Sequence, residues 1–159
     1  MISIVMPCYN RASFLQRALD NIRAQSFKEI EVVIVDDGST DNTREKVESL
    51  KNKYSFPISY LFQHNQGAAA ARQIGVKHSK GEFIAFFDSD DLWFESYLES
   101  LQNVILRNEL DWVYCPIERR SLGDNKLLVP NSFYVNNKPR PFVTFSEILE
   151  HNVHKLDSE

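Results

Sequence analysis

Short apolar runs alternate with segments of helical character through the first 110 residues of this chain. The apolar runs are residues 2–6, 31–37, 57–62 and 83–87. The segments that follow them carry apolar side chains every three or four positions, which is typical of a helix with one buried face. These helical segments are about 14–25, 43–53, 68–78 and 97–105. Crossovers of this length let neighbouring strands pair in parallel, so the pattern predicts an α/β fold with a doubly wound, mostly parallel sheet flanked by helices.

Local features refine these predicted elements. Ser13 is the expected N-cap of the first helix, and Pro7 is expected to end the first strand. Gly75 lies inside the third helix, where glycine lowers the helix propensity. The run 83–87 holds no polar residue, which is typical of a strand buried on both faces of its sheet.

The chain from Asp111 onward is less regular. A fifth strand over 111–116 and a hairpin over 119–129 are predicted, followed by a loop over 130–141. The sequence TFSE at residues 144–147 has the pattern of a capping box, which predicts a short helix from about Phe145.

Length, charge and cysteine content exclude several classes of protein. A chain of 159 residues is expected to form one domain, and a net charge of −4 without a block of like charge argues against a nucleic-acid partner. Cys8 and Cys115 form no C-x-x-C pair, so a reduced, cytoplasmic chain is the simplest interpretation. No run approaches the roughly 20 apolar residues of a membrane span, and the N-terminus lacks the basic region of a signal peptide.

Unusual residues gather where the predicted strands end. They are Pro7, Tyr9 and Arg11 after the first run, Asp36 and Asp37 at the end of the second, and Asp88, Asp90 and Asp91 after the fourth. In a doubly wound sheet, ligands bind outside the carboxyl ends of the strands. The sequence therefore predicts a ligand site at this edge of the sheet.

The residue types at this edge suit a nucleotide. Asp37 can accept a hydrogen bond from a base N–H, and the ring of Tyr9 can stack on a base. Arg11 and Arg72 are candidate contacts to phosphate. We therefore expect base, sugar and phosphate groups to find partners here.

The acidic cluster suggests a metal. Asp88 and Asp90 can reach the same side of the chain, where two carboxylates ~4 Å apart repel by ~4 kcal/mol at an effective dielectric of ~20. Water, a raised pKa or a divalent cation would relieve this repulsion, and the oxygens suit Mg²⁺ or Mn²⁺. A solvated acidic loop is the plain alternative.

Two common nucleotide motifs are missing. The sequence has no G-x-G-x-x-G after its first strand and no G-x-x-x-x-G-K-[ST], which argues against NAD-type and P-loop sites. The D-x-D spacing of Asp88 and Asp90 leaves open a phosphatase-like phosphotransferase with Asp88 as nucleophile. That alternative gives no role to Asp36, Asp37 or the loop around Tyr9.

Four segments, in this order, resemble the nucleotide-binding half of a family-2 glycosyltransferase with the GT-A, Rossmann-like fold. They are 2–11 (ISIVMPCYNR), 31–43 (EVVIVDDGSTDNT), 65–75 (NQGAAAARQIG) and 81–91 (GEFIAFFDSDD). The resemblance covers about residues 2–98. It implies a donor-binding core over 1–110 and the start of an acceptor-side region over 111–159, with the C-terminal part of the fold truncated.

The resemblance also implies roles for individual residues. The implied nucleotide-sugar site consists of Pro7, Tyr9, Arg11, Asp37, Gly67, Arg72, Asp88, Ser89 and Asp90. Within it, Pro7, Tyr9 and Asp37 line the base pocket. Arg72 lies near the diphosphate, and Asp88 and Ser89 approach the ribose and phosphate. Asp90, together with Asp88, coordinates the Mn²⁺ or Mg²⁺.

The implied activity is metal-dependent, inverting transfer of a sugar from a nucleoside-diphosphate sugar, with UDP as the expected nucleotide. The implied acceptor is the hydroxyl of a glycan or a lipid-linked molecule, as in cell-surface polysaccharide synthesis at the inner face of a membrane. The family's catalytic base lies beyond Glu159, so no base is assigned. A donor-binding module that is inactive alone is therefore the alternative. An incomplete acceptor half would expose apolar surface and favour self-association into a homo-oligomer.

Overall fold

The computed structural model describes residues 1–113, 119–120 and 127–129. The chain divides into two compact units, Met1–Glu95 and Ser96–Glu159. The elements of the first unit, in order, are β1 (Ile2–Cys8), α1 (Ala12–Ala24), β2 (Ile30–Asp36), α2 (Thr43–Leu50), the 3-10 helix η1 (Lys51–Lys53), β3 (Ile58–Phe62), α3 (Ala68–His78) and β4 (Phe83–Phe86). The second unit contains α4 (Tyr97–Asn108), β5 (Arg119–Arg120) and β6 (Leu127–Val129). The predicted alternation of strands and helices is confirmed.

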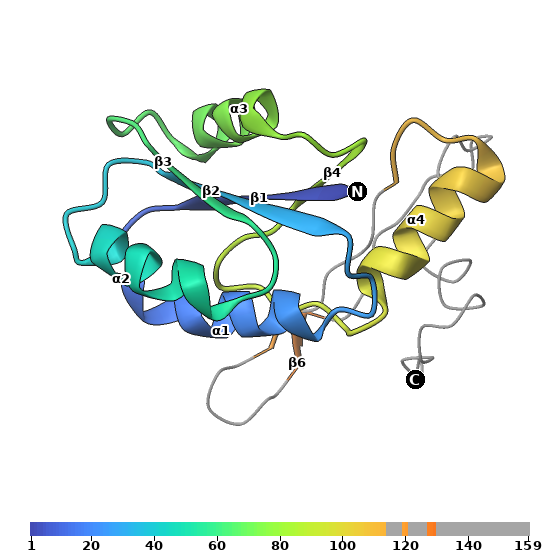
Figure 1. Cartoon of the computed structure of the whole chain (residues 1–159), viewed down its shortest axis with the longest axis horizontal. Helices are drawn as coiled ribbons and strands as arrows, with labels where there is room; N and C mark the ends of the chain where they lie inside the picture. Colours follow the sequence, from blue (N-terminus) through green and yellow to red (C-terminus); the bar gives the residue numbers. More distant parts are fainter. Residues whose placement is uncertain (114–118, 121–126, 130–159) are drawn as a thin grey trace. The chain divides into compact units, whose positions relative to one another are not determined.

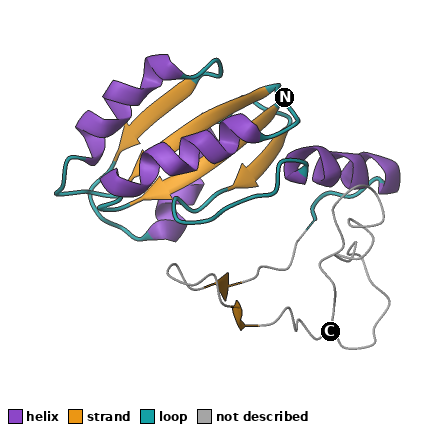
Figure 2. Cartoon of the chain, turned by 90° about the horizontal axis from the view of Figure 1, so that it is seen from below, coloured by secondary structure: helices purple, strands orange, loops and turns teal. Residues whose placement is uncertain are grey.

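The first unit is built on a parallel sheet with the strand order β3-β2-β1-β4. Helices α1 and α2 cover one face of this sheet, and α3 covers the other (Figures 1 and 2). The predicted doubly wound α/β fold is therefore confirmed. Because the chain first moves outward from β1 to β3 and then returns to β4, the strand order reverses between β1 and β4. A cleft opens at the carboxyl ends of the strands where the order reverses in this way.

The core lies around β1 and β2, whose residues are all buried. On one face, α1 packs Leu15, Leu19 and Ile22 against the sheet with no exposed surface. On the other face, α3 packs against β1 and β2 through its small residues. β1 and β2 are buried on both sides because each face of the sheet has its own helical layer.

Gly75 is the reason why α3 can lie so close to the sheet. A Cβ atom at this position would overlap the side chain of Val5 on β1 and approach Val35 Cγ2 to 3.3 Å. The glycine therefore does more than lower helix propensity. It sets the spacing between the helix and the two central strands.

β1 is longer than the sequence indicates. It continues through Pro7 to Cys8, and the Asp37 N–H donates to the Cys8 carbonyl at 2.9 Å. The prediction that Pro7 ends the strand is wrong, because a proline still accepts backbone hydrogen bonds through its carbonyl group.

β4 is not buried on both faces, and that prediction is also wrong. Ile84 is 37% exposed and Phe86 is 51% exposed. In the described part of the sheet, β4 pairs only with β1, and α3 packs on β1 and β2 instead. The apolar side chains of β4 that face the α3 side therefore lie beyond the area that this helix covers.

The first helix is capped from a distant loop. α1 begins at Ala12, and Ser13 is an exposed residue of its first turn, so the predicted N-cap is wrong. The Ala12 N–H donates to Asp41 Oδ2 at 3.3 Å, and the Arg11 N–H donates to Thr43 Oγ1 at 3.2 Å. The loop after β2 and the first residue of α2 thus supply the acceptors that free N–H groups at a helix start require.

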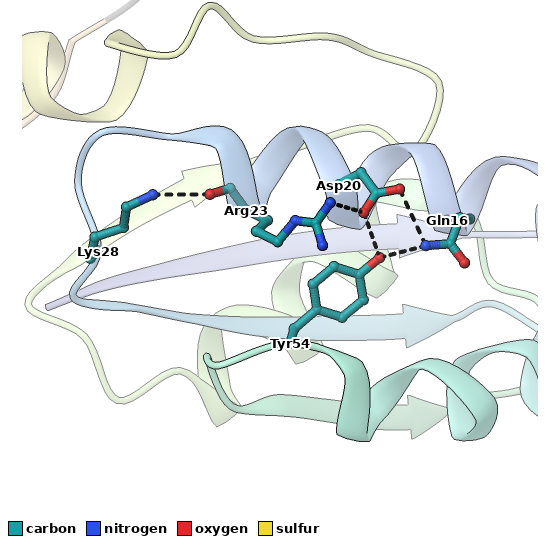
Figure 3. A network of polar contacts seen from close by, with 5 residues as sticks. All are labelled: Gln16, Asp20, Arg23, Lys28 and Tyr54. Atoms are coloured by element: carbon teal, nitrogen blue, oxygen red, sulfur yellow. Dashed lines mark hydrogen bonds and ion pairs between the residues drawn. The ribbon is translucent and has the colours of Figure 1, made fainter.

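A polar network ties the outer side of α1 to the connection before β3 (Figure 3). Gln16 Nε2 donates to Tyr54 Oη at 2.9 Å, and the Tyr54 hydroxyl donates to Asp20 Oδ1 at 3.2 Å. The Arg23 guanidinium pairs with the same carboxylate at 3.0 Å. Burial, followed by the charge of Asp20, raises the pKa of Tyr54 to about 12, so this hydroxyl stays a donor at neutral pH.

Only part of the second unit belongs to the described residues. Arg119 pairs with Val129 and Arg120 with Leu127 in antiparallel orientation, as the predicted hairpin requires, and the connection between them lies outside the described residues. Residues 111–113 are not in a strand, and the rest of the predicted fifth strand, the loop over 130–141 and the helix from Phe145 lie outside the described residues. The structural division falls between Glu95 and Ser96, while the functional boundary at residue 110 stays a prediction. Among the described residues, no helix is long and apolar enough to cross a membrane.

We predict that Gly75→Ala destabilises the protein although alanine is the better helix former. Alanine gains ~1 kcal/mol of helix propensity, but overpacking against Val5 costs ~1–3 kcal/mol, so the free energy of unfolding should fall or at best stay level. Urea denaturation measures the change. In a Val5→Ala background the penalty should shrink, because the overlapping methyl groups are gone. Gln73→Ala, at an exposed position of the same helix, is the control. A clear gain in stability from Gly75→Ala would contradict the close packing of α3.

Candidate functional site

A pocket of about 350 Å³ opens at the carboxyl ends of β1 and β4. Its lining residues are Pro7, Cys8, Tyr9, Arg11, Asp37, Ala68, Arg72, Asp88, Ser89 and Asp90. Of the residues that the sequence analysis assigned to the nucleotide-sugar site, only Gly67 is not among them. Cys8 and Ala68 were not predicted, and both are the direct neighbours of predicted residues. The pocket lies where the strand order reverses, as expected for a doubly wound sheet.

Arginines neutralise the acidic end of the pocket. Arg72 Nη2 lies 2.6 Å from Asp88 Oδ1, and Arg11 Nη2 lies 3.9 Å from Asp90 Oδ2. The side chains of Asp88 and Asp90 are 47% and 53% exposed, so both carboxylates remain open to a ligand. The guanidinium groups of Arg72 and Arg11 thus offset part of the repulsion within the acidic cluster, which the sequence alone did not indicate.

The acidic residues form a turn. The Asp91 N–H donates to the Asp88 carbonyl at 2.9 Å, and Ser89 between them is buried. Burial raises the pKa of Asp91, and the negative charges of Asp88 and Asp90 add to this effect. Asp91 does not line the pocket, so Asp88 and Asp90 are the carboxylates that a ligand would meet there.

Asp37, which lines the pocket just after β2, holds the start of α3. Its carboxylate is buried and accepts hydrogen bonds from Gln63 Nε2 at 2.6 Å and from the N–H groups of Gln66 and Gly67 at 2.8 Å each. Gly67 is the N-cap of α3 and has a φ of 88°, which glycine adopts without strain. The carboxylate therefore also lies at the positive end of the helix dipole. Asp37 thus fixes the helix that carries Arg72.

The loop that carries Tyr9 is held by the loop after β2. Asn10 adopts a left-handed conformation with a φ of 54°, which asparagine tolerates better than most residues. Its Oδ1 accepts from the Thr40 N–H at 2.8 Å, and its N–H donates to Ser39 Oγ at 2.8 Å. The ring of Tyr9 is left 46% exposed at the pocket. Sequence reasoning missed Asn10, whose turn-forming residue type was the available signal.

Asp36 has a structural role on the far side of β2. Its oxygens accept from the Tyr60 hydroxyl at 2.6 Å and from the Ser39 N–H at 2.8 Å, and its side chain does not line the pocket. Of the two neighbouring acids at the end of β2, only Asp37 belongs to the site. Burial, together with the hydrogen bond and the charge of Asp36, raises the pKa of Tyr60.

Cys8 lines the pocket as an uncharged thiol. Burial is the main cause that raises its pKa to about 12, and the charges of Asp36 and Asp41 contribute. A thiol in this state is a poor nucleophile and a poor metal ligand.

A divalent cation fits the acidic end only together with a ligand that brings further oxygens. Among the described residues, no group of three or more histidine, cysteine or acidic side chains could hold a metal. Asp88 and Asp90 offer carboxylate oxygens at one pocket. Mg²⁺ sites commonly consist of one or two carboxylates plus substrate phosphates. The donor set therefore suits a cation that binds with a diphosphate.

The family model that matches this chain and the relatives compared with it are all glycosyltransferases. A family model described as glycosyl transferase family 2 matches residues 3–153. An uncharacterized glycosyltransferase of Rickettsia typhi is 35% identical over 122 residues, which are 74% of this chain and 36% of the relative. Glycosyltransferase GlyA of Streptococcus pneumoniae is 36% identical over 110 residues, which are 69% of this chain and 16% of the relative. An uncharacterized glycosyltransferase of Nostoc is matched over 34% of its length. This chain therefore spans about a third of the Rickettsia and Nostoc relatives and less than a fifth of GlyA.

Solved structures with this fold include complexes with nucleotide sugars. S. aureus TarS 1–349 in complex with UDP-GlcNAc has a TM-score of 0.66 and 32% identity, over 77% of this chain and 35% of that one. The mannosyltransferase PcManGT from Pyrobaculum calidifontis, in complex with GDP-Man and Mn²⁺, has a TM-score of 0.69 and 27% identity, over 74% of this chain and 35% of that one. These neighbours are GT-A glycosyltransferases, in agreement with the predicted GT-A type of this fold.

We predict that Asp37→Asn destabilises the protein by ~1–3 kcal/mol, because the amide group places an N–H donor where the carboxylate accepts from backbone N–H groups. Asp90→Asn is the matched control, since it makes the same change at an exposed residue of the same pocket and should stay within ~0.5 kcal/mol of the wild type. Urea denaturation compares the two variants. Equal stabilities would contradict the role of Asp37 in holding α3.

We also predict that Cys8 resists alkylation in the folded protein. With a pKa of about 12, roughly one thiol in ten thousand is ionised at pH 8, and the side chain is buried. In a Cys115→Ser background, iodoacetamide should leave the native protein unlabelled and should label it in urea. Mass spectrometry detects the adduct. Rapid labelling of the native protein at pH 8 would show that Cys8 is more acidic or more accessible.

Proposed function

Because this chain belongs to glycosyltransferase family 2, we propose that it provides the donor site for sugar transfer from a nucleoside-diphosphate sugar to an acceptor hydroxyl. The observation that carries the proposal is that Asp37, Tyr9, Arg72 and the acidic pair line one and the same pocket. Residues 1–110 form the donor-binding core in this proposal, and 111–159 begin the acceptor side. Transfer is metal-dependent and inverting.

The proposed donor is a UDP-sugar. Hydrogen bonds from Gln63, Gln66 and Gly67 occupy three of the roughly four acceptor sites of the Asp37 carboxylate, which leaves about one site for a base. Uracil offers a single ring N–H, whereas guanine presents neighbouring N–H donors that would need both oxygens. The exposed ring of Tyr9 is available for stacking. The complexes of TarS with UDP and UDP-GlcNAc, at 32% identity, support the same choice.

The diphosphate would lie between the arginines and the acidic pair. Asp88 and Asp90 would hold Mn²⁺ or Mg²⁺, which would neutralise charge on the departing diphosphate. Arg72 now pairs with Asp88, and its guanidinium would donate hydrogen bonds to phosphate oxygens once the ligand is bound. Arg11, beside Asp90, would contribute a second positive charge. Ser89 would approach the ribose and phosphate.

Activation of the acceptor belongs to the other half of the reaction. An inverting transfer needs a general base that removes the proton of the attacking hydroxyl. We place this base outside the donor core of residues 1–110. The proposed acceptor is a glycan or a lipid-linked molecule at the inner face of a membrane. Self-association of the chain stays a prediction from the sequence.

Calorimetric titration with UDP, UDP-sugars and GDP, with and without Mn²⁺, tests the proposal. We predict that UDP binds in a Mn²⁺-dependent manner and that Asp90→Asn weakens this binding on the order of ten-fold or more, because a metal ligand is lost. Asp20→Asn, on the outer side of α1, is the control and should bind as the wild type does. Absence of UDP binding under every condition would overturn the proposal. Preference for GDP would contradict the choice of donor only.

A turnover assay separates transferase from binding module. The chain spans 36% and 34% of its relatives from Rickettsia typhi and Nostoc, and 16% of GlyA. A donor-binding module that is inactive alone is the alternative that the assay tests. Sugar transfer by the 159-residue chain would instead place the base within it. Formation of an aspartyl-phosphate at Asp88 would support the phosphotransferase alternative.

A further inference from the structure

One side of α1 carries polar residues at every fourth position. Arg17 and Asn21 lie within the helix, and Gln25 is the first residue after it. A spacing of four places side chains above one another on the same side of a helix. Gln25 has no exposed surface, and the Arg17 Nε is buried, so this row is not a solvated surface.

The row contacts the backbone of residues 90–95, which follow the acidic turn. Arg17 Nη2 donates to the Asp90 carbonyl at 3.0 Å. Asn21 makes two hydrogen bonds to the backbone of Trp93. Its side-chain amide donates to the Trp93 carbonyl at 2.9 Å and accepts from the Trp93 N–H at 2.8 Å. Gln25 Nε2 donates to the Phe94 carbonyl at 2.9 Å.

These contacts hold the acidic turn from its downstream side. On its upstream side, the Phe87 N–H donates to the Val5 carbonyl at 3.0 Å, which continues the pairing of β4 with β1. The ring of Trp93 packs edge-on against Phe87, with centroids 4.6 Å apart. The segment that carries Asp88 and Asp90 is thus bound to the sheet on its upstream side and to α1 on its downstream side.

The carboxylate of Asp90 is only weakly held by contacts of its own side chain. Its side chain is 53% exposed, and its ion pair with Arg11 spans 3.9 Å. An exposed ion pair of this kind restrains a side chain little. The backbone bond from Arg17 to Asp90 and the bonds from Asn21 to Trp93 therefore provide the firmer restraint on where the Asp90 carboxylate lies. Displacement by about 1 Å is enough to weaken a site that must place its groups accurately.

We propose that Arg17, Asn21 and Gln25 are positioning residues of the donor site, which hold residues 90–95 on α1 and so keep Asp88 and Asp90 at the pocket. The inference rests on the proposed function for its effect on ligand binding. The attachment of residues 90–95 to α1 can be tested without any ligand.

The experiment compares variants on opposite sides of one helix. Arg17→Met and Asn21→Leu remove the contacts to residues 90–95 while retaining side-chain volume. Arg23→Met and Gln16→Leu make the same kinds of change on the side of α1 that faces Tyr54 (Figure 3). Arg17→Lys retains a donor and should rescue most of the effect of Arg17→Met. All variants carry Trp112→Phe, which leaves Trp93 as the sole tryptophan.

Two readouts are measured on each folded variant. Emission and acrylamide quenching of Trp93 report whether residues 90–95 remain on α1. Calorimetry gives the Kd of UDP with Mn²⁺, and NMR titration gives the Kd of uridine, which lacks the phosphates. We expect Arg17→Met and Asn21→Leu to shift Trp93 emission to longer wavelength and to raise the Kd of UDP with Mn²⁺ on the order of ten-fold. The Kd of uridine should change less than about two-fold, whereas general destabilisation would reduce the binding fraction for both ligands alike.

Each other outcome has a defined meaning. Unchanged Trp93 emission in both variants would overturn the inference, as would a shift in emission with an unchanged Kd for UDP. Equal effects of the Arg23 and Gln16 variants would show that α1 acts only through stability. If the wild type binds no nucleotide, the proposed function fails, and Trp93 emission then decides alone whether α1 holds residues 90–95.

Discussion

Pairing of β1 on both of its edges is the constraint on which the first unit depends. β1 pairs with β2 from Ile2 to Cys8 and with β4 from Ile2 to Val5, and every residue of the strand is buried. Because β4 returns to the opposite edge of β1 from β2, the helices before and after the reversal lie on opposite faces of the sheet (Figure 1). Neither layer covers the carboxyl end of β1. The pocket is therefore a consequence of strand order. Its lining residues come from the end of β1, from the segments after β1, β2 and β4, and from the first turns of α3.

Residues far away in the sequence provide the hydrogen-bond acceptors for the helix starts around this pocket. In α1, α2, α3 and α4, no N-cap side chain bonds to its own helix. Asp41 accepts from the start of α1, Asp37 accepts from the start of α3, and α1 in turn bonds to residues 90–95. Hydrogen bonds between segments far apart in sequence form only when the sheet is assembled. The geometry of the site is thus coupled to folding of the whole unit, and Asp37 serves both the pocket and the helix that carries Arg72.

Much of the fold and the pocket could be predicted because both depend on local patterns. Apolar runs and helical periodicity located every strand of the parallel sheet to within about two residues, and the rule for doubly wound sheets located the site. Two residues were misinterpreted for another reason. Ser13 looks like an N-cap, yet Asp41 supplies the acceptor; Gly75 looks like a defect, yet Val5 requires it. In each case the deciding partner lies more than 25 residues away, where no local pattern can indicate it.

The two acids at the end of β2 show what the sequence determines and what the tertiary structure determines. The sequence by itself determined that carboxylates would stand at the carboxyl edge of a parallel sheet, and that neighbours such as Asp36 and Asp37 would point to opposite sides of the strand. Only the tertiary structure decided which of them meets the ligand. Tyr60, from the adjacent strand β3, binds Asp36, whereas Asp37 reaches the pocket and the start of α3. The physical reason is that alternation along a strand is a local property, while the partner on each face depends on which strand and helix lie beside it.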